Sequence, residues 1–352
     1  MPPGSVGIAG IVLLGVFCVS QAGMRTAPSN GWPLRCVYNW DMNRSITAVL
    51  FCLLAALPAA AAALGTAPRG VIPAEVQQII SVDYRKLGGS PSALALKARA
   101  LPEHLKQFEA ALRGVGINPD ADLDQLTFAS FRTPKSGLRI VGIAQGQFPA
   151  KAVLQKIRQR KLRAQKYRGT DVYPMGETVK MAFLDDWTLL FGDSTAVRAA
   201  LDTRDGQGPS LNANSQITDL MPSVETGALW SVLDAAGTQN MLRSSLGEAA
   251  RLADFESVRK RLLGSRYVMD FDSGVDFDLD ILTSDNFSAA TLSSLIQAGM
   301  MFRKMSATGA EKTALENLTV NSDGGRVKLH FESDEKRFQA LVQSDLFNNF
   351  SR

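Results

Sequence analysis

The sequence predicts an α+β fold made of two tandem related halves, with antiparallel sheets and helices packed on one face. Three observations lead to this prediction. Strand-like stretches come in pairs joined by short turns, which is typical of antiparallel hairpins. Helix-like stretches separate the pairs, and the same order of elements occurs twice. Hairpins alternating with helices indicate antiparallel sheets that carry their helices on one face.

The chain divides into five predicted segments: residues 1–41, an upstream extension of the reading frame or a leader; residues 42–65, a signal peptide or N-terminal anchor; residues 66–203, the first half; residues 204–228, a linker; and residues 229–352, the second half. The linker is rich in Gly, Asn and Ser, which favours a boundary there.

Residues 42–65 have the features of an export signal. Arg44 precedes an apolar run from Ile46 to Leu57, and an alanine tract with A-x-A cleavage sites follows Pro58. Cleavage between Ala61 and Thr66 is expected, which predicts a periplasmic or extracellular protein. The alternative is an uncleaved membrane anchor over residues 46–64, which has about the length that a spanning helix needs.

The charged residues and cysteines limit the chemistry of the mature chain. All three cysteines, Cys18, Cys36 and Cys52, lie in or before the signal, so we expect no disulfide and no Cys-ligated metal. From Leu64 onward the chain has 35 basic and 33 acidic residues, a net charge of +2. The overall pI of about 9.0 is therefore no argument for a nucleic-acid partner, and we expect none.

The first half begins with a patternless linker at residues 65–71, expected to hold the domain clear of a membrane, and a strand at residues 76–84. A helix starts at Ser90-Pro91 by the capping rule, and Pro102 should kink or divide it. The remaining elements are a hairpin of residues 126–131 and 138–148, a helix from Pro149, a hairpin of residues 164–173 and 179–191, and a helix from Ser194 to about Leu201.

The second half repeats this order. Its first strand, residues 229–234, matches residues 80–83, because Ser81-Val82 recurs as Ser231-Val232. The later elements are helices at residues 238–263, a hairpin of residues 267–272 and 275–283, a helix at residues 288–305, a hairpin of residues 318–322 and 326–331, and a helix at residues 334–346.

The export signal, the duplicated halves and the phrases IVGIAQGQF, KYRGTDVYPM and AFLDDWTLLFGD together resemble a loose group of exported bacterial proteins of unknown function. The resemblance covers most of the mature chain and implies two related α+β halves. Since no activity is attached to that group, the resemblance implies no functional residue.

A basic run without any acid between its members follows the second hairpin strand. Its positions are Lys151, Lys156, Arg158, Arg160, Lys161, Arg163, Lys166 and Arg168. Such a run can bind anionic lipid headgroups at an envelope surface. The plainer interpretation is the solvated face of a helix.

An acidic ladder lies on the hairpin of the second half: Asp270, Asp272, Asp276, Asp278 and Asp280. Alternation predicts that all five share one face of the hairpin. Carboxylate oxygens suit a hard cation such as Ca²⁺, although the spacing does not fit an EF-hand loop. The plainer interpretation is a solvated face that discourages pairing between sheet edges.

The sequence contains no complete catalytic or cofactor-binding motif. The two histidines, His104 and His330, lie far apart in the chain, and there is no phosphate loop or dinucleotide motif. We therefore expect a non-catalytic exported protein without a cofactor, whose partner is another envelope protein, a peptide or an anionic lipid. The alternative is a hydrolase of envelope material that uses two carboxylates in a cleft.

Overall fold

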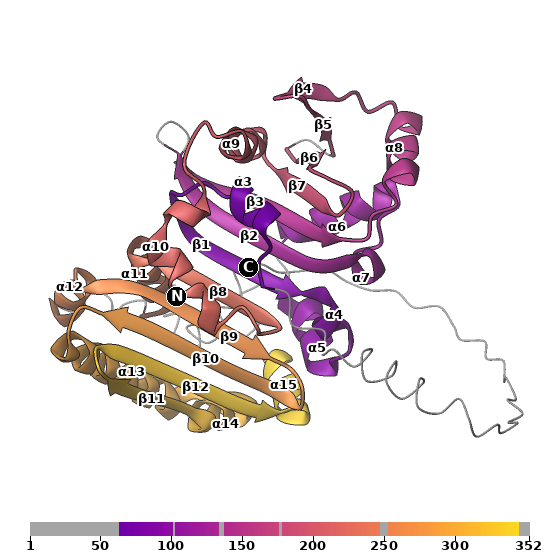
Figure 1. Ribbon diagram of the computed structural model, residues 1–352. Helices are drawn as coiled ribbons and strands as arrows, with labels where there is room; N and C mark the ends of the chain where they lie inside the picture. Colours follow the sequence, from indigo (N-terminus) through magenta and orange to yellow (C-terminus); the bar gives the residue numbers. More distant parts are fainter. Residues whose placement is uncertain (1–62, 101–102, 134–136, 176–177, 247–252, 345–352) are drawn as a thin grey trace, which may run out of the picture.

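A computed structural model describes residues 63–100, 103–133, 137–175, 178–246 and 253–344 (Figure 1). Its strands form one continuous antiparallel sheet of twelve strands, in the order β11-β12-β10-β9-β8-β1-β2-β3-β7-β6-β5-β4. The predicted α+β class with antiparallel pairing is confirmed. The strands form a single sheet, however, where separate sheets were expected.

The elements of the first half are α3 (Thr66–Val71), β1 (Val76–Asp83), α4 (Tyr84–Gly88), α5 (Pro91–Ala100), α6 (Glu103–Val115), α7 (Pro119–Asp122), β2 (Leu123–Thr133), β3 (Gly137–Gly146), α8 (Ala150–Gln159), β4 (Gln165–Tyr167), β5 (Thr170–Pro174), β6 (Lys180–Phe183), β7 (Thr188–Gly192) and α9 (Ser194–Arg204). The predicted hairpin over residues 164–191 is thus a meander of four strands. Turns at Gly169 and at Asp185–Trp187 divide it.

The connecting segment and the second half contain η1 (Leu211–Ala213), α10 (Ser215–Thr218), η2 (Met221–Ser223), β8 (Leu229–Asp234), α11 (Ala235–Leu246), α12 (Ala253–Arg259), β9 (Leu262–Asp270), β10 (Gly274–Thr283), α13 (Asn286–Ser306), α14 (Gly309–Asn317), β11 (Leu318–Asp323), β12 (Arg326–Asp334) and α15 (Glu335–Val342).

The strand order is the same on both sides of the central pair β1–β8. Outward from this pair, the sheet continues as β2-β3-β7-β6 on one side and as β9-β10-β12-β11 on the other. The meander strands β4 and β5 extend the first side only. Each half therefore places its two hairpins in the same positions relative to the shared centre (Figure 1).

The expected match between Ser81 and Ser231 is wrong. Ser81 lies opposite Thr127 and Trp230, whereas Ser231 lies opposite Ile80 and Tyr267, which puts the two hydroxyls on opposite faces of the sheet. The aspartates that end β1 and β8 correspond instead. Asp83 and Asp234 each accept backbone N–H groups from the helix that follows their strand.

Both faces of the sheet carry helices, although helices on one face only were expected. One core contains Val82, Leu126 and Phe277 from the strands with apolar side chains of helices α4 to α6, α8 and α11 to α15. The other core contains Ile79, Ala129 and Val232 with side chains of α3, α9 and α10. Beyond β9, the second face of the sheet carries alternating polar residues and stays exposed over β10 and β12.

Two segments that were expected to be linkers are packed against the sheet. Leu64, Val71 and Ile72 are buried in the second core, and α3 forms where a patternless linker was expected. Residues 204–228 also bury Leu211, Ile217 and Met221. Both predictions relied on Gly, Pro and Ser content, which does not reveal the few apolar side chains that anchor such a segment.

Candidate functional site

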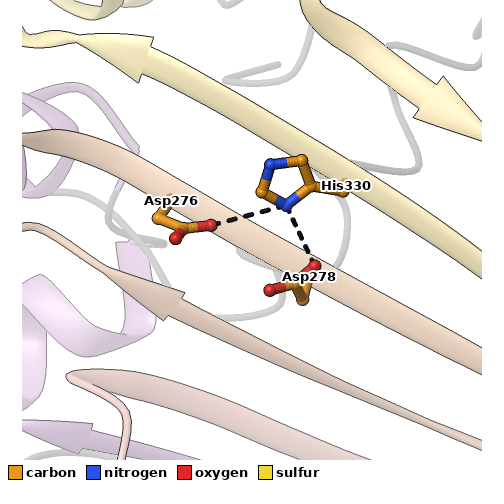
Figure 2. A group of neighbouring side chains, drawn as sticks. All are labelled: Asp276, Asp278 and His330. Atoms are coloured by element: carbon orange, nitrogen blue, oxygen red, sulfur yellow. Dashed lines mark hydrogen bonds and ion pairs between the residues drawn. The ribbon is translucent and has the colours of Figure 1, made fainter.

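The exposed face of β10 and β12 brings His330 next to two aspartates (Figure 2). Asp278 lies directly opposite His330 in the sheet, and Asp276 is two residues before Asp278. Nδ1 of His330 is 3.0 Å from Oδ1 of Asp278 and 3.6 Å from Oδ1 of Asp276. The three side chains offer ligand atoms that all lie within 4.8 Å of one another. Carboxylate and imidazole ligands suit a divalent cation such as Zn²⁺.

Asp276 lies in an unfavourable electrostatic environment. Asp270 and Glu332 are its direct neighbours on the two adjoining strands. Partial burial, followed by the charge of Asp278, raises the pKa of the Asp276 carboxyl, and the nearby His330 opposes this. A cation between the carboxylates would relieve the repulsion.

The rest of the acidic ladder has other roles. The Asp270 carboxylate accepts the backbone N–H of Ala228 at 2.8 Å, and Asp280 accepts two N–H groups of Arg266. Asp272 follows the end of β9 and lies in the turn, so the expectation that all five aspartates share one strand face is wrong for this residue.

Sequence reasoning missed His330 because it considered each hairpin separately. The alternation of β12 puts Lys328, His330 and Glu332 on one face, but only the pairing of β10 with β12 shows that this is the face of the ladder.

The basic residues of the run are all exposed and lie on α8, the following loop, β4 and the turn after β4. Lys156 and Arg160 extend over Gly116 and Gly114 at the C-terminal end of α6, where cations stabilise the helix dipole. Arg168 pairs with Asp202 at 2.8 Å. These three residues therefore have a structural role. Lys151, Arg158, Lys161, Arg163 and Lys166 form no ion pair with any residue in the described ranges.

A second candidate surface lies on the outward side of α13. Phe287, Met301, Phe302 and Met305 are exposed by 81%, 70%, 74% and 86%. At 3.6 residues per turn they lie within roughly 60° of one line along the helix. Ser294 and Ala298 fill the space between them, so this outward stripe of α13 carries no charged residue. We call these six residues the α13 stripe.

The α13 stripe is unusual because the opposite side of the same helix is also apolar. Leu292, Ile296 and Met300 are buried against the sheet. A surface helix normally has charged or polar residues on its outer side. Sequence reasoning missed the stripe because it gave only the bounds of this helix, residues 288–305, and did not compare the number of its apolar positions with the width of one buried face.

In the ranges that the structure describes, no helix has both the length and the apolar character that crossing a membrane requires. Apart from Ala63 and Leu64, the expected anchor over residues 46–64 lies outside these ranges, as do the three cysteines and the expected cleavage signal.

Comparisons with known proteins identify no family for this chain. A scan against protein-family models finds no match, and a search of curated proteins finds none. Among solved structures, crystal form I of TP0453 is similar to this chain, with a TM-score of 0.42 and 10% sequence identity. The similarity covers 79% of this chain and 96% of that chain.

Proposed function

We propose that this chain is an exported, non-catalytic binding protein of the cell envelope, and that its α13 stripe docks on an apolar, uncharged surface of another envelope protein. The observation that carries the proposal is the exposure of four large apolar side chains on one uncharged helix face. Exposed apolar patches of this kind mark interaction sites. Methionine adapts to irregular apolar partners, which suits Met301 and Met305 to this role.

The absence of charge on the stripe favours a protein over an anionic lipid surface. Helices that lie in a lipid interface carry many Lys and Arg residues on their polar side. In α13 the only charged residues are Arg303 and Lys304, and Arg303 pairs with Glu311 of α14. A neutral protein surface therefore matches the stripe better than a negatively charged membrane does.

The alternative, a carboxylate-dependent hydrolase, has less support. Asp276 and Asp278 are exposed on the sheet face, where water reaches both carboxylates. Asp270 and Asp280 are also engaged in structural bonds. Because these two carboxylates are already held by other groups of the protein, they are poorly placed to transfer protons to or from a substrate.

The docking proposal is tested by photo-cross-linking in the native cell. A photoreactive amino acid is placed at Phe302, at Met305 or at the exposed Thr319 of β11 in the full-length chain. We expect the same envelope protein, identified by mass spectrometry, to be cross-linked from both stripe positions and not from Thr319. Adding Met301→Asp should abolish this product, whereas Lys312→Asp, an exposed change on α14, should not. Cross-linking only to lipid, or to unrelated proteins from each position, would refute docking on a protein.

The export proposal is tested by the intact mass of the protein from fractionated cells. The backbone carbonyl of Leu64 accepts the Nε–H of Arg69 at 2.8 Å, and the Leu64 side chain is buried. Cleavage after Leu64 would remove these contacts, so we expect a mature start between Ala61 and Leu64 in the soluble envelope fraction. A product that starts at Met1 or Met42 and stays in the membrane fraction would instead support the anchor over residues 46–64.

A further inference from the structure

A pocket of about 560 Å³ lies where the two halves meet, at the start of β1 and the end of β2. Helix α9, the loop that precedes α10, and Asp234 at the end of β8 complete its wall. None of its lining residues belongs to the α13 stripe or to the cluster around His330. Its volume is within the range of about 300 to 1,000 Å³ that is usual for small-molecule sites.

The wall of this pocket is held in place by hydrogen bonds between the loop and the segment that precedes β1. The backbone N–H of Ala74 donates to Pro209 O at 3.0 Å, and Leu211 N–H donates to Ile72 O at 2.8 Å. The side-chain amide of Asn214 donates to Ala74 O at 2.7 Å. A pocket built in this way is formed before any ligand arrives, which lowers the entropic cost of binding.

Unpaired charges of both signs line the pocket. Glu75 and Arg132 are neighbours through a backbone hydrogen bond, in which Arg132 N–H donates to Glu75 O at 3.4 Å. Their side chains make no hydrogen bond or ion pair with the described part of the chain. Asp202, by contrast, already binds Tyr167 and Arg168.

Asp234 is the third charged group without a counter-ion. Its Oδ1 accepts the Gly237 N–H at 2.6 Å, and no cation of the described residues pairs with it. Partial burial raises the pKa of this carboxyl above its ordinary value, and the backbone N–H groups of Gly237 and Ala236 oppose this. The pocket therefore contains two carboxylates and one guanidinium that the protein itself does not neutralise.

We propose that this pocket binds a zwitterionic ligand of amino-acid or short-peptide size, with its ammonium group on Asp234 and Glu75 and its carboxylate on Arg132. An anion alone would be repelled by the two carboxylates, and a cation alone would leave Arg132 unpaired beside it. The planar guanidinium binds a carboxylate through two hydrogen bonds, and ionised partners make the strongest such bonds.

The remaining polar groups suit a peptide bond. Gln77 and Gln207 line the pocket, and their side-chain amides have no partner among the residues that the structure describes. Each amide provides both a donor and an acceptor, which matches the N–H and C=O groups of a peptide. Ligand binding in this pocket is independent of docking at α13, because the pocket and the α13 stripe share no residue.

The test is isothermal titration calorimetry of the full mature chain with Ala-Ala and Ala-Ala-Ala, and with the N-acetylated and C-amidated forms of each. We expect the free peptides to bind, and each capped form to bind about tenfold more weakly or worse, since one charge-assisted contact is lost. Arg132→Gln should weaken the free peptide to the level of its amidated form without changing the affinity for that form.

Glu75→Gln should weaken the free peptide and leave the acetylated form unaffected. Arg158→Gln on α8, outside the pocket, is the matched control and should change nothing. All three sites are exposed, so the variants should keep the melting temperature of the wild type. Undetectable binding of both free peptides, or equal binding of free and capped forms, would refute the zwitterion site.

Discussion

At the residue scale, the surroundings of Asp276 predict that its charge lowers stability near neutral pH. Its carboxyl has a raised pKa in the folded state because of partial burial and the neighbouring Asp278. A raised pKa means that the protonated form is favoured by folding, so the penalty develops as pH rises through the folded-state pKa. We therefore expect Asp276→Asn to raise the melting temperature at pH 7, with a smaller difference at a pH below the ordinary pKa of 3.8.

The same variant tests the expected cation site. If a divalent cation binds Asp276, Asp278 and His330, adding Zn²⁺ or Ca²⁺ should raise the melting temperature of the wild type and not that of Asp276→Asn. A variant that is less stable than the wild type at pH 7 without added cation would contradict the repulsion argument.

Asp285 has the opposite behaviour. It caps α13: Oδ1 accepts the Ser288 N–H at 2.8 Å, and Oδ2 accepts an Arg261 N–H at 3.0 Å. The Ser288 backbone contact is the main cause that lowers its pKa to about 2. The stability from its charge is therefore present above the unfolded-state pKa and is lost as pH falls toward about 2.

Asp285→Asn keeps an oxygen for the cap but has no charge to lose. We expect its melting temperature to fall less than that of the wild type between about pH 4 and about pH 2, as measured by circular dichroism. Equal losses in the two proteins over this interval would show that the Asp285 charge does not contribute.

At the element scale, local signals predicted more of the structure than did long-range matches. The Ser90-Pro91 start is correct, since Ala93 N–H donates to Ser90 Oγ at 3.3 Å. The expected hairpin of residues 318–322 and 326–331 also forms, as β11 and β12, with Gly324 and Gly325 in its turn. Turns and caps depend on neighbours in sequence, which the sequence shows directly.

Features set by tertiary contacts were not predictable in this way. The joining of both halves through β1 and β8, and the meeting of His330 with Asp278, both depend on which strands pair. The pocket near Glu75 and Arg132 depends in addition on a loop that the Gly and Asn content alone assigned to an open linker. No local pattern carries this information.

Strand β3 shows how one glycine can determine the packing of an element. Gly142 lies opposite Phe128 and Phe191, and a Cβ at this position would occupy the space of the Phe191 ring. That ring stacks on Phe108 with centroids 3.4 Å apart. Gly142→Ala should therefore displace Phe191 and cost about 1–3 kcal/mol in the free energy of unfolding by overpacking.

Urea unfolding measures this cost, with Gly70→Ala as the control. Gly70 lies in α3 with open space around its Cβ position, so alanine there should stabilise the protein by up to about 1 kcal/mol through helix propensity. If both variants changed stability equally, the contact between Gly142 and Phe191 would not be the cause.

At the scale of the whole molecule, the two halves share one folded unit. Strands β1 and β8 pair over Gln78 to Val82, and the larger core includes side chains from both halves. Helix α15 of the second half packs against α5 of the first. Lys86 Nζ also donates to Thr226 O at 2.7 Å. Separating the halves would expose a long apolar strand edge on each.

We therefore expect the mature chain to unfold in one cooperative transition, despite its internal repetition. Hydrogen exchange followed by mass spectrometry across a urea series provides the measurement, because it reports on each half separately. Peptides from the β2–β3 hairpin and from the β9–β10 hairpin should lose protection at the same urea concentration. Ile79 is fully buried in β1, opposite Ala129 of β2 and Val232 of β8. Ile79→Ala weakens the packing where β1 and β8 join the halves, and it should shift both urea midpoints together. Two separate midpoints would mean that each half folds on its own and that the β1–β8 pairing joins independent domains.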